Sequence, residues 1–162
     1  MLVTTKYNQT TISKKVSLSG VGLHTGKDVS LTFCPADADH GYSFKRIDLE
    51  GNPIIEADAN YVTSTERGTC LNKNDIIIQT CEHVLASLVG LQIDNVLIEL
   101  NASEPPIMDG SSKFFVEAIE KAGIKELSKK RKEFVVKNVI SYRDEDSGSE
   151  TTVLPSNEYQ VT

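Results

Sequence analysis

The chain has 162 residues, of which 39% are hydrophobic and 25% charged, and its formal net charge at neutral pH is −6. This composition excludes disordered and fibrous classes and is typical of a globular protein with one domain and part of another. The acidic balance argues against nucleic acid as a partner, because that binding relies on clustered Lys and Arg.

Targeting signals and cysteine patterns are absent from the sequence. The N-terminus lacks the apolar core of a signal peptide, and no apolar run reaches the length that spans a membrane, so we expect a cytoplasmic protein without a transmembrane segment. The three cysteines, Cys34, Cys70 and Cys81, include no C-x-x-C pair. We therefore interpret them as reduced packing residues rather than as disulfides or zinc ligands.

The first half of the chain is predicted to be rich in short strands. Alternating or apolar residues predict strands over residues 11–18, 28–33, 42–47, 54–57, 69–71 and 76–78. Residues 20–26 contain three glycines but fit no phosphate-binding motif, so a hairpin or bulge is expected there. The whole series indicates an antiparallel meander.

The best helical pattern covers residues 80–91, and Thr80 is the expected N-cap. Its apolar stripe has helical spacing and consists of Cys81, Val84, Leu85, Leu88 and Val89. The opposite side carries His83 and small residues, namely Ala86, Ser87 and Gly90. An ordinary exposed helix would carry long polar side chains there, so we expect something to lie close against this side.

The pattern alone leaves two interpretations of Glu82 and His83. A Glu near a helix N-terminus is favoured by the helix dipole, and a neighbouring His is usually solvated or hydrogen-bonded. Alternatively, the pair is a carboxylate base beside a zinc ligand. The zinc signature H-x-x-E-H would need a His at position 79, where the chain has Gln79. This helix would therefore offer a metal one ligand only.

The second half contains a further helix and more strands. Residues 95–100 are almost continuously apolar, which predicts a strand in the middle of a sheet. A helix is expected over residues 112–122, with Asp109 as a candidate cap and Gly123 as its stop. The charged residues 126–133 are interpreted as a solvated connector. Strands follow at residues 134–140, 151–154 and 158–161, with a polar turn at 143–148.

These elements predict an α+β fold, a two-layer sandwich in which two helices, at about residues 80–91 and 112–122, cover one face of a mostly antiparallel sheet. We assign residues 1–127 to this domain. Residues 128–162 are assigned to a linker and the first strands of an incomplete second domain, because so few residues cannot bury a core alone. Since the last strand pattern is cut off at Thr162, we expect a fragment of a longer protein.

Four motifs together resemble the UDP-3-O-acyl-N-acetylglucosamine deacetylases, the zinc hydrolases of lipid A biosynthesis. They are Ser-Gly-Val-Gly-Leu-His-Thr-Gly at residues 19–26, Thr-Cys-Glu-His at 80–83, Gly-Leu-Gln-Ile-Asp-Asn at 90–95 and Pro-Ile-Met-Asp-Gly-Ser at 106–111. The resemblance covers that family's first domain and the opening strands of its second. Segments 42–50 and 65–69 look closest to members that are fused to a hydroxyacyl dehydratase.

The resemblance implies that Glu82 is the catalytic carboxylate and His83 the first zinc (Zn²⁺) ligand. The other ligands would come from an H-x-x-x-D motif in the missing second domain. Glu82 would accept the proton of the water that attacks the acetamide, so that acetate is released. The expected partners are the substrate UDP-3-O-acyl-N-acetylglucosamine and the missing second domain, but not nucleic acid. The fragment alone is expected to be inactive, because one His cannot hold a catalytic zinc.

Other candidate residues receive no chemical role. His24 and Asp109 lie in loops that match the family and could border the site. His24 and Asp28 have the H-x-x-x-D spacing, but they lie in a turn that runs into a strand, which would not bring both side chains to one face. His40 is expected to be solvated. The basic run at residues 129–132 could attract an anionic nucleotide, although a solvated linker is the preferred interpretation.

Two other functions stay open at this point. One is a non-catalytic binding or assembly module that offers the small helix face to a partner. The other is nucleotide or nucleic-acid binding. Exposed Glu82 and His83 side chains near a helix start would favour the deacetylase, whereas a buried and hydrogen-bonded His83 would remove the physical basis for a metal site.

Overall fold

The computed structural model describes residues 1–158 and 160–161, which divide into two units. One unit comprises Asn8–Lys129. The other combines Met1–Tyr7 with the segment that begins at Lys130. The strands β1 (Leu2–Ile12) and β10 (Ile124–Phe134) run through both units and pair with each other.

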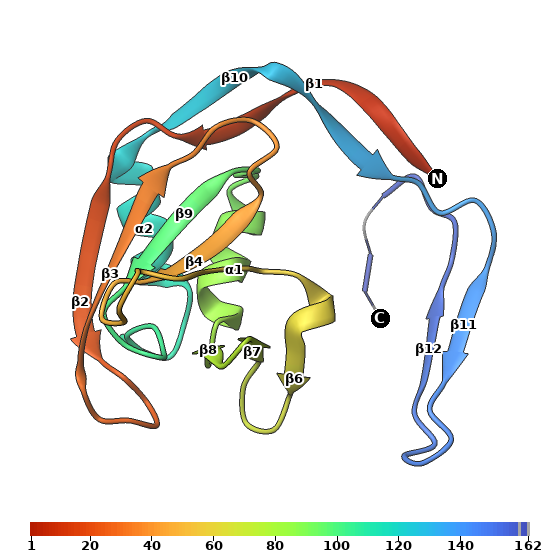
Figure 1. The fold of residues 1–162 in the computed structure, drawn as a ribbon. Helices are drawn as coiled ribbons and strands as arrows, with labels where there is room; N and C mark the ends of the chain where they lie inside the picture. The colour runs from red at the N-terminus through yellow and green to blue at the C-terminus, as the bar shows by residue number, and fades with distance from the viewer. Residues whose placement is uncertain (159, 162) are drawn as a thin grey trace. The chain divides into compact units, whose positions relative to one another are not determined.

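A five-stranded sheet forms the frame of the larger unit (Figure 1). Its strands in spatial order are β2 (Val16–Val21), β3 (Asp28–Pro35), β9 (Val96–Leu100), β4 (Tyr42–Arg46) and β5 (Ile54–Glu56). The β4 and β9 strands are parallel, and the other neighbours are antiparallel. The expected mostly antiparallel sheet is confirmed. The expected meander is wrong, because β9, the most continuously apolar strand, enters between β3 and β4.

One face of this sheet is buried, as the alternation of residue types in β3 predicts. Val29, Leu31 and Phe33 are almost completely buried, while Ser30 and Thr32 between them are partly exposed. Successive strand residues point to opposite faces, so the apolar residues of β3 share one face. The sheet therefore needs a second layer on that side only.

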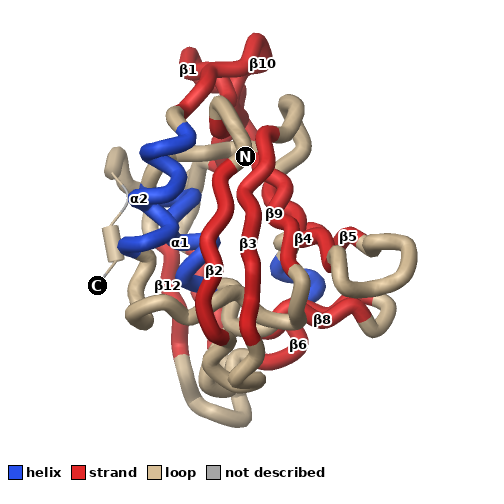
Figure 2. Tube along the Cα trace, turned by 90° about the vertical axis from the view of Figure 1, so that its left-hand side faces the viewer, coloured by secondary structure: helices blue, strands red, loops and turns tan. Residues whose placement is uncertain are grey.

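The helices α1 (Glu82–Gly90) and α2 (Lys113–Ala122) supply the second layer on this face (Figures 1 and 2). The Phe33 ring of β3 packs edge-on against the Phe115 ring of α2, with centroids 6.4 Å apart. Leu88 of α1 is fully buried in the same core. Helix α2 ends at Gly123, which has a φ of 75°. The predicted sandwich and the predicted helix stop are both confirmed.

The predicted start of the first helix is wrong. Helix α1 begins at Glu82 with Cys81 as its N-cap residue, and no side chain caps it. Thr80 instead has a φ of 52°, and its buried hydroxyl has no hydrogen-bond partner among the described residues. The N–H of Gln79, which precedes it, donates to Ser103 O at 2.7 Å. The chain turns at Thr80, and both the N-cap and the first helical residue lie one residue later than a Thr80 cap predicts.

The buried side of α1 also differs from the predicted stripe. Val89 was predicted to be buried but is 63% exposed, whereas Ser87, predicted on the opposite side, is 1% exposed. The Ser87 hydroxyl donates to Val84 O at 2.6 Å, so it is satisfied within the helix and can be buried. The core of the sandwich lies on one side of α1, and Val89 lies on the other, exposed side.

A smaller sheet precedes α1. It consists of β6 (Val62–Ser64), β7 (Cys70–Lys73) and β8 (Ile76–Ile78), and a short 3-10 helix (Ala59–Tyr61) leads into it. The sequence did not predict β6, which has only three residues. Asn74 and Asp75 both have positive φ in the two-residue turn between β7 and β8, as a tight hairpin requires.

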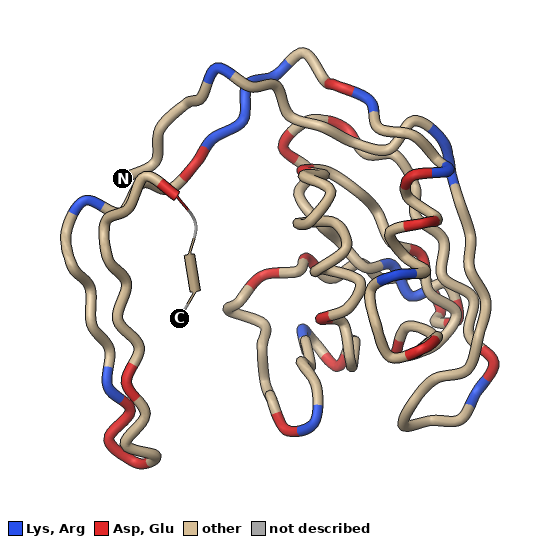
Figure 3. The backbone as a smooth tube through the Cα atoms, turned by 180° about the vertical axis from the view of Figure 1, so that it is seen from behind, with Lys and Arg blue, Asp and Glu red and all other residues tan. Residues whose placement is uncertain are grey.

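Two sequence predictions fail around β1 and β10. Residues 11–18 do not form one strand, since β1 ends at Ile12 and β2 begins at Val16. The charged residues 126–133 are exposed, as expected, but form the middle of β10 rather than a connector. Basic residues recur along this strand (Figure 3). Long charged side chains can stay in water while the backbone of a two-stranded ribbon is paired, so charge alone did not exclude a strand here.

The smaller unit contains an exposed hairpin of β11 (Ile140–Arg143) and β12 (Glu150–Val153). The predicted polar turn between these strands is confirmed, and the N–H of Gly148 closes it by donating to Asp144 O at 2.8 Å. The strand predicted at 134–140 is misplaced, because Phe134 ends β10 and β11 begins at Ile140. The strand predicted at 158–161 includes Tyr159, which lies outside the described residues.

Within residues 1–158 and 160–161, neither helix has the length and apolar character needed to cross a bilayer.

The two sides of α1 predict a difference in stability between neighbouring substitutions. Leu88→Ala should lower the free energy of unfolding by about 2–5 kcal/mol, because it leaves a cavity in the core. Val89→Ala is the matched control and should change it by less than about 0.5 kcal/mol, because the Val89 side chain is mostly exposed. Urea unfolding of the 162-residue chain measures both values. Equal losses would contradict the observed orientation of the helix.

Candidate functional site

Glu82 and His83 lie together in the first turn of α1. Their side chains are 37% and 35% exposed, and Glu82 Oε1 lies 4.0 Å from His83 Nε2. Both groups are therefore accessible, and His83 is not buried in the core. A buried and hydrogen-bonded His83, which would have removed the physical basis for a metal site, is therefore not observed, and the catalytic and metal-binding roles stay predictions.

The Glu82 carboxylate is held by the loop before β7. The backbone N–H of Thr69 donates to Glu82 Oε2 at 2.9 Å. Gly68 lies beside this contact with a φ of 153°, a backbone conformation that favours glycine, and a Cβ there would be in ordinary van der Waals contact with Glu82 Oε1 and Thr80 Oγ1, 3.4 Å from each. A carboxylate is also favoured at a helix N-terminus by the helix dipole. One oxygen is thus fixed by the loop, while the other lies on the side of His83.

Cys81 faces the other way. It is fully buried, and its thiol donates to Thr69 O at 3.5 Å. Burial and the neighbouring Glu82 carboxylate raise the pKa of this thiol to about 12. A neutral buried thiol is a poor metal ligand, because the thiolate is the form that binds. The prediction that Cys81 is a packing residue is confirmed.

The loop between β9 and α2, residues 101–112, fastens the start of α1 to the sheet. Ser103 O accepts from the N–H of Gln79, and the Ser112 hydroxyl donates to His83 O at 2.9 Å. Further along the same loop, the N–H of Ile107 donates to Val21 O at the end of β2 at 2.9 Å. The turn between β2 and β3, this loop and the start of α1 therefore lie at one end of the sheet.

Glu104, which the sequence did not predict as a site residue, is 0% exposed near the start of that loop. Its Oε1 accepts from the Thr25 hydroxyl at 2.6 Å, from the Thr25 N–H at 2.7 Å and from the His24 N–H at 3.2 Å. Burial alone would raise the pKa of Glu104, but these hydrogen bonds lower it below the ordinary value of 4.5. A glutamate between a central apolar strand and two prolines, in a chain with a separate glycine-rich turn, was the available signal.

The other candidates have simpler surroundings. His24 is exposed in the turn between β2 and β3, and no helix joins it to Asp28, as the sequence predicts. Asp109 Oδ1 accepts from the N–H and hydroxyl of Ser111, so it caps the turn before α2 rather than the helix itself, whose N-cap residue is Ser112. His40 is exposed, as expected.

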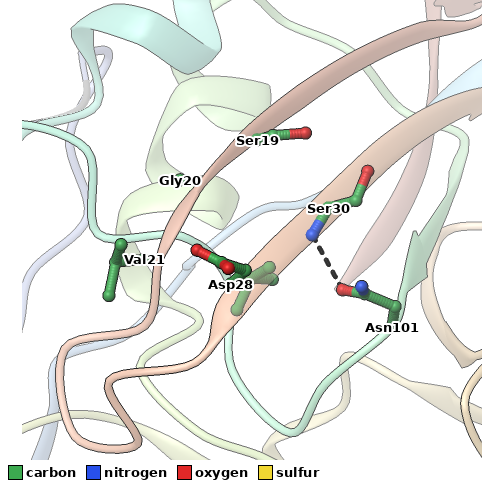
Figure 4. Close-up of a pocket in the computed structure, with 7 residues that line it drawn as sticks. Ser19, Gly20, Val21, Asp28, Ser30 and Asn101 are labelled. Atoms are coloured by element: carbon green, nitrogen blue, oxygen red, sulfur yellow. Dashed lines mark hydrogen bonds between the residues drawn. The ribbon is translucent and has the colours of Figure 1, made fainter.

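A cavity of about 400 Å³ lies at β2 and β3 (Figure 4). Glu82, His83 and Glu104 are not among the residues that line it. Its floor includes Asn101, whose Oδ1 accepts from the Ser30 N–H at 2.7 Å. Asp28 is the one titratable side chain among its lining residues. The cavity therefore carries no pair of groups for acid–base chemistry.

No group of three or more His, Cys, Asp or Glu residues that could hold a metal ion occurs in the part of the chain that the structure describes. His83 thus stands alone as a metal-ligating candidate beside Glu82.

Comparison with known proteins identifies the family. A family model for LpxC, UDP-3-O-acyl N-acetylglycosamine deacetylase, matches residues 9–162. The chain belongs to the LpxC family. This membership agrees with the motifs quoted from the sequence, including the Thr-Cys-Glu-His motif at residues 80–83.

Individual relatives agree with the LpxC assignment. The chain is 47% identical over 153 residues to the bifunctional enzyme LpxC/FabZ of Bacteroides thetaiotaomicron, covering 94% of this chain and 33% of that protein. It is 46% identical over 154 residues to the UDP-3-O-acyl-N-acetylglucosamine deacetylase of Geotalea uraniireducens, covering 95% of this chain and 50% of that protein. The chain thus spans about a third to a half of the length of these LpxC relatives.

The lowered pKa of Glu104 predicts how this carboxylate affects stability with pH. A carboxylate whose pKa is lower in the folded state stabilises that state above its unfolded pKa, and this contribution is lost as the pH falls through the folded pKa. Glu104→Gln should therefore lower the free energy of unfolding most above about pH 4.5. The difference in the free energy of unfolding between this variant and the wild type should become smaller towards pH 3.

Urea titrations between pH 3 and pH 7 measure this difference, and Glu120→Gln, which replaces an exposed carboxylate on α2, is the control. A difference for Glu104→Gln that stays constant over this range would contradict the lowered pKa.

Proposed function

We propose that the chain forms the N-terminal part of a zinc-dependent deacetylase that acts on UDP-3-O-acyl-N-acetylglucosamine in lipid A biosynthesis. In this proposal, residues 1–127 are its first domain and residues 128–162 are the opening strands of its second. The observation that carries it is the exposed Glu82–His83 pair at the start of α1 in a member of the LpxC family.

The surroundings of His83 fit a ligand in a shared zinc site. Its side chain is partly exposed at a helix start, whereas Cys81 is buried and neutral. A catalytic zinc has typically three protein ligands and an open position. Because the described residues bring no further ligands together, we propose that the remaining ones come from the second domain.

The open side of α1 supports such a neighbour. Ala86, Val89 and Gly90 are exposed on it, and all three are small or medium-sized and uncharged. A helix face of this kind allows close approach of another layer, whereas a face meant for water would usually carry Lys or Glu. We propose that the second domain covers this side and so places its ligands near His83.

Glu82 would act as the general base. Bound zinc would polarise the acetamide carbonyl and make the attacking water more acidic. The free oxygen of Glu82 would take the proton from that water while the Thr69 N–H holds the other oxygen in place. The departing nitrogen would receive a proton from an acid of the second domain or from Glu82 in its protonated form. The C–N bond breaks, and acetate and the free 2-amino group are the products.

Substitutions in the complete reading frame that contains this chain test the two roles separately. Glu82→Ala should keep its zinc and lose acetate release by about two orders of magnitude or more, the usual contribution of acid–base catalysis. His83→Ala should lower the zinc content as well. Zinc is measured by atomic absorption and acetate release with the UDP-sugar, and Glu120→Gln is the control.

Unchanged turnover of Glu82→Ala would contradict the proposal and would favour a non-catalytic binding module with the same fold.

The 162-residue chain by itself should release no acetate from the UDP-sugar, because it offers one metal-ligating side chain at this position. Isothermal titration with zinc should likewise show no tight binding site at His83. The wild-type chain and its His83→Ala variant should therefore give the same titration. Turnover by the isolated chain at a rate near that of the complete protein would contradict the shared site.

A further inference from the structure

The Glu104 carboxylate is a charged group buried in the loop between β9 and α2. Glu104 is 0% exposed, and burial of a carboxylate is unfavourable by several kcal/mol unless hydrogen bonds or opposite charges compensate for it. In residues 1–158 and 160–161, no Lys or Arg forms an ion pair with Glu104. The Thr25 hydroxyl and the N–H groups of Thr25 and His24 provide the compensation instead.

The turn between β2 and β3 is shaped around this carboxylate. A Cβ on Gly22 would lie 2.2 Å from Glu104 Oε1 and 2.8 Å from Glu104 Cδ, so only glycine leaves room for the group. The N–H of Gly22 donates to Lys27 O, and the N–H of Gly26 donates to Gly22 O. The turn therefore closes on itself and directs its free N–H groups inward. Without an acceptor inside, those groups would be unsatisfied.

This arrangement binds the backbone of His24 but leaves its side chain exposed. Ser103, the residue before Glu104, accepts from Gln79 just ahead of α1, and Ser112 of the same loop contacts the His83 carbonyl. One loop thus holds both the turn that carries His24 and the helix start that carries His83. The backbone segments that carry His24 and His83 therefore lie at the same end of the sheet.

We propose that Glu104 is a positioning residue, which fixes the turn at residues 22–27 so that the His24 imidazole borders the deacetylase site and contacts the UDP-sugar. This inference rests on the proposed function. An imidazole that can both donate and accept a hydrogen bond suits a substrate rich in hydroxyl and phosphate oxygens. A turn without its buried anchor would present the same side chain in many orientations and lose the benefit of a fixed contact.

The complete reading frame with Glu104→Gln tests the anchor directly. Glutamine keeps the shape of the side chain but removes its charge and puts an NH₂ donor in place of Oε2, which accepts from the His24 N–H at 3.2 Å. That contact is lost, and the bonds that the amide oxygen still accepts from the turn are weaker than bonds to a carboxylate. Hydrogen exchange in peptides covering residues 22–27 should become faster, and peptides from α2 should not change. Glu120→Gln is the matched control and should leave the exchange of the turn as it is. The hydrogen bond between Ile107 and Val21 still joins the loop to β2, so the variant retains a tether there.

A second pair of variants tests the anchor if Glu104→Gln does not fold. Thr25→Val removes the hydroxyl that donates to Glu104 and should also speed the exchange of the turn, whereas Thr25→Ser keeps this donor and should restore slow exchange. Wild-type exchange in both Glu104→Gln and Thr25→Val would overturn the anchor.

Kinetics distinguish positioning from a purely structural role. Glu104→Gln should lower kcat/KM about tenfold at unchanged zinc content, as should His24→Ala, which corresponds to one lost hydrogen bond to the substrate. The double variant should be no slower than His24→Ala, because Glu104 acts through that residue. Multiplying losses, or wild-type kinetics in Glu104→Gln with a loosened turn, would overturn the proposal.

A wild-type protein that binds zinc but releases no acetate would instead overturn the deacetylase function and, with it, any catalytic use of His24. The exchange experiment would still decide whether Glu104 holds the turn, so the two failures can be told apart.

Discussion

The arrangement of the candidate site depends on how one loop is held. Residues 101–112 leave the central strand β9, which pairs with β3 on one side and β4 on the other, so the loop starts from the most constrained strand of the sheet. Hydrogen bonds of Ser103 and Ser112 then hold the entry to α1, and Glu104 holds the turn after β2. The turn after β2 and the entry to α1 are thus held by the same loop. Side chains on loops are usually placed less precisely than those on helices or strands, and hydrogen bonds of this kind reduce the difference.

The periodic parts of the fold could be predicted from the sequence, because burial on one face dictates the residue pattern. Strands β3 and β9 and helix α2 follow this rule, and so does the two-layer architecture. The predictions failed where distant contacts override local preference. Thr80 is a good capping residue, yet it has left-handed backbone in the structure, and Gln79 before it is hydrogen-bonded to the distant loop. The charged strand β10 was missed because a paired ribbon needs no apolar face to keep its backbone bonds.

In the candidate site, too, local patterns could be predicted from the sequence and distant contacts could not. Pattern alone did not choose between a solvated pair and a catalytic pair at Glu82 and His83, and the choice came from motifs that resemble a family. Both side chains are partly exposed in the structure, and their catalytic role stays a prediction. Glu104 could not be found by spacing, because its Thr25 partner lies 79 residues earlier in the chain. Such a contact becomes visible only when the sheet brings the two loops together. Short-range rules identify helix faces, but they do not identify anchors between loops.

The inward orientation of Cys81 determines which donor atoms this part of α1 could offer to a metal ion beside Glu82. With the sulfur turned into the core and kept protonated, the donors from this helix turn are an imidazole nitrogen and carboxylate oxygens. Thiophilic ions such as Cd²⁺ or Cu⁺ prefer sulfur, whereas nitrogen and oxygen donors suit harder or borderline cations. The helix start therefore offers a cation no exposed sulfur donor beside Glu82 and His83.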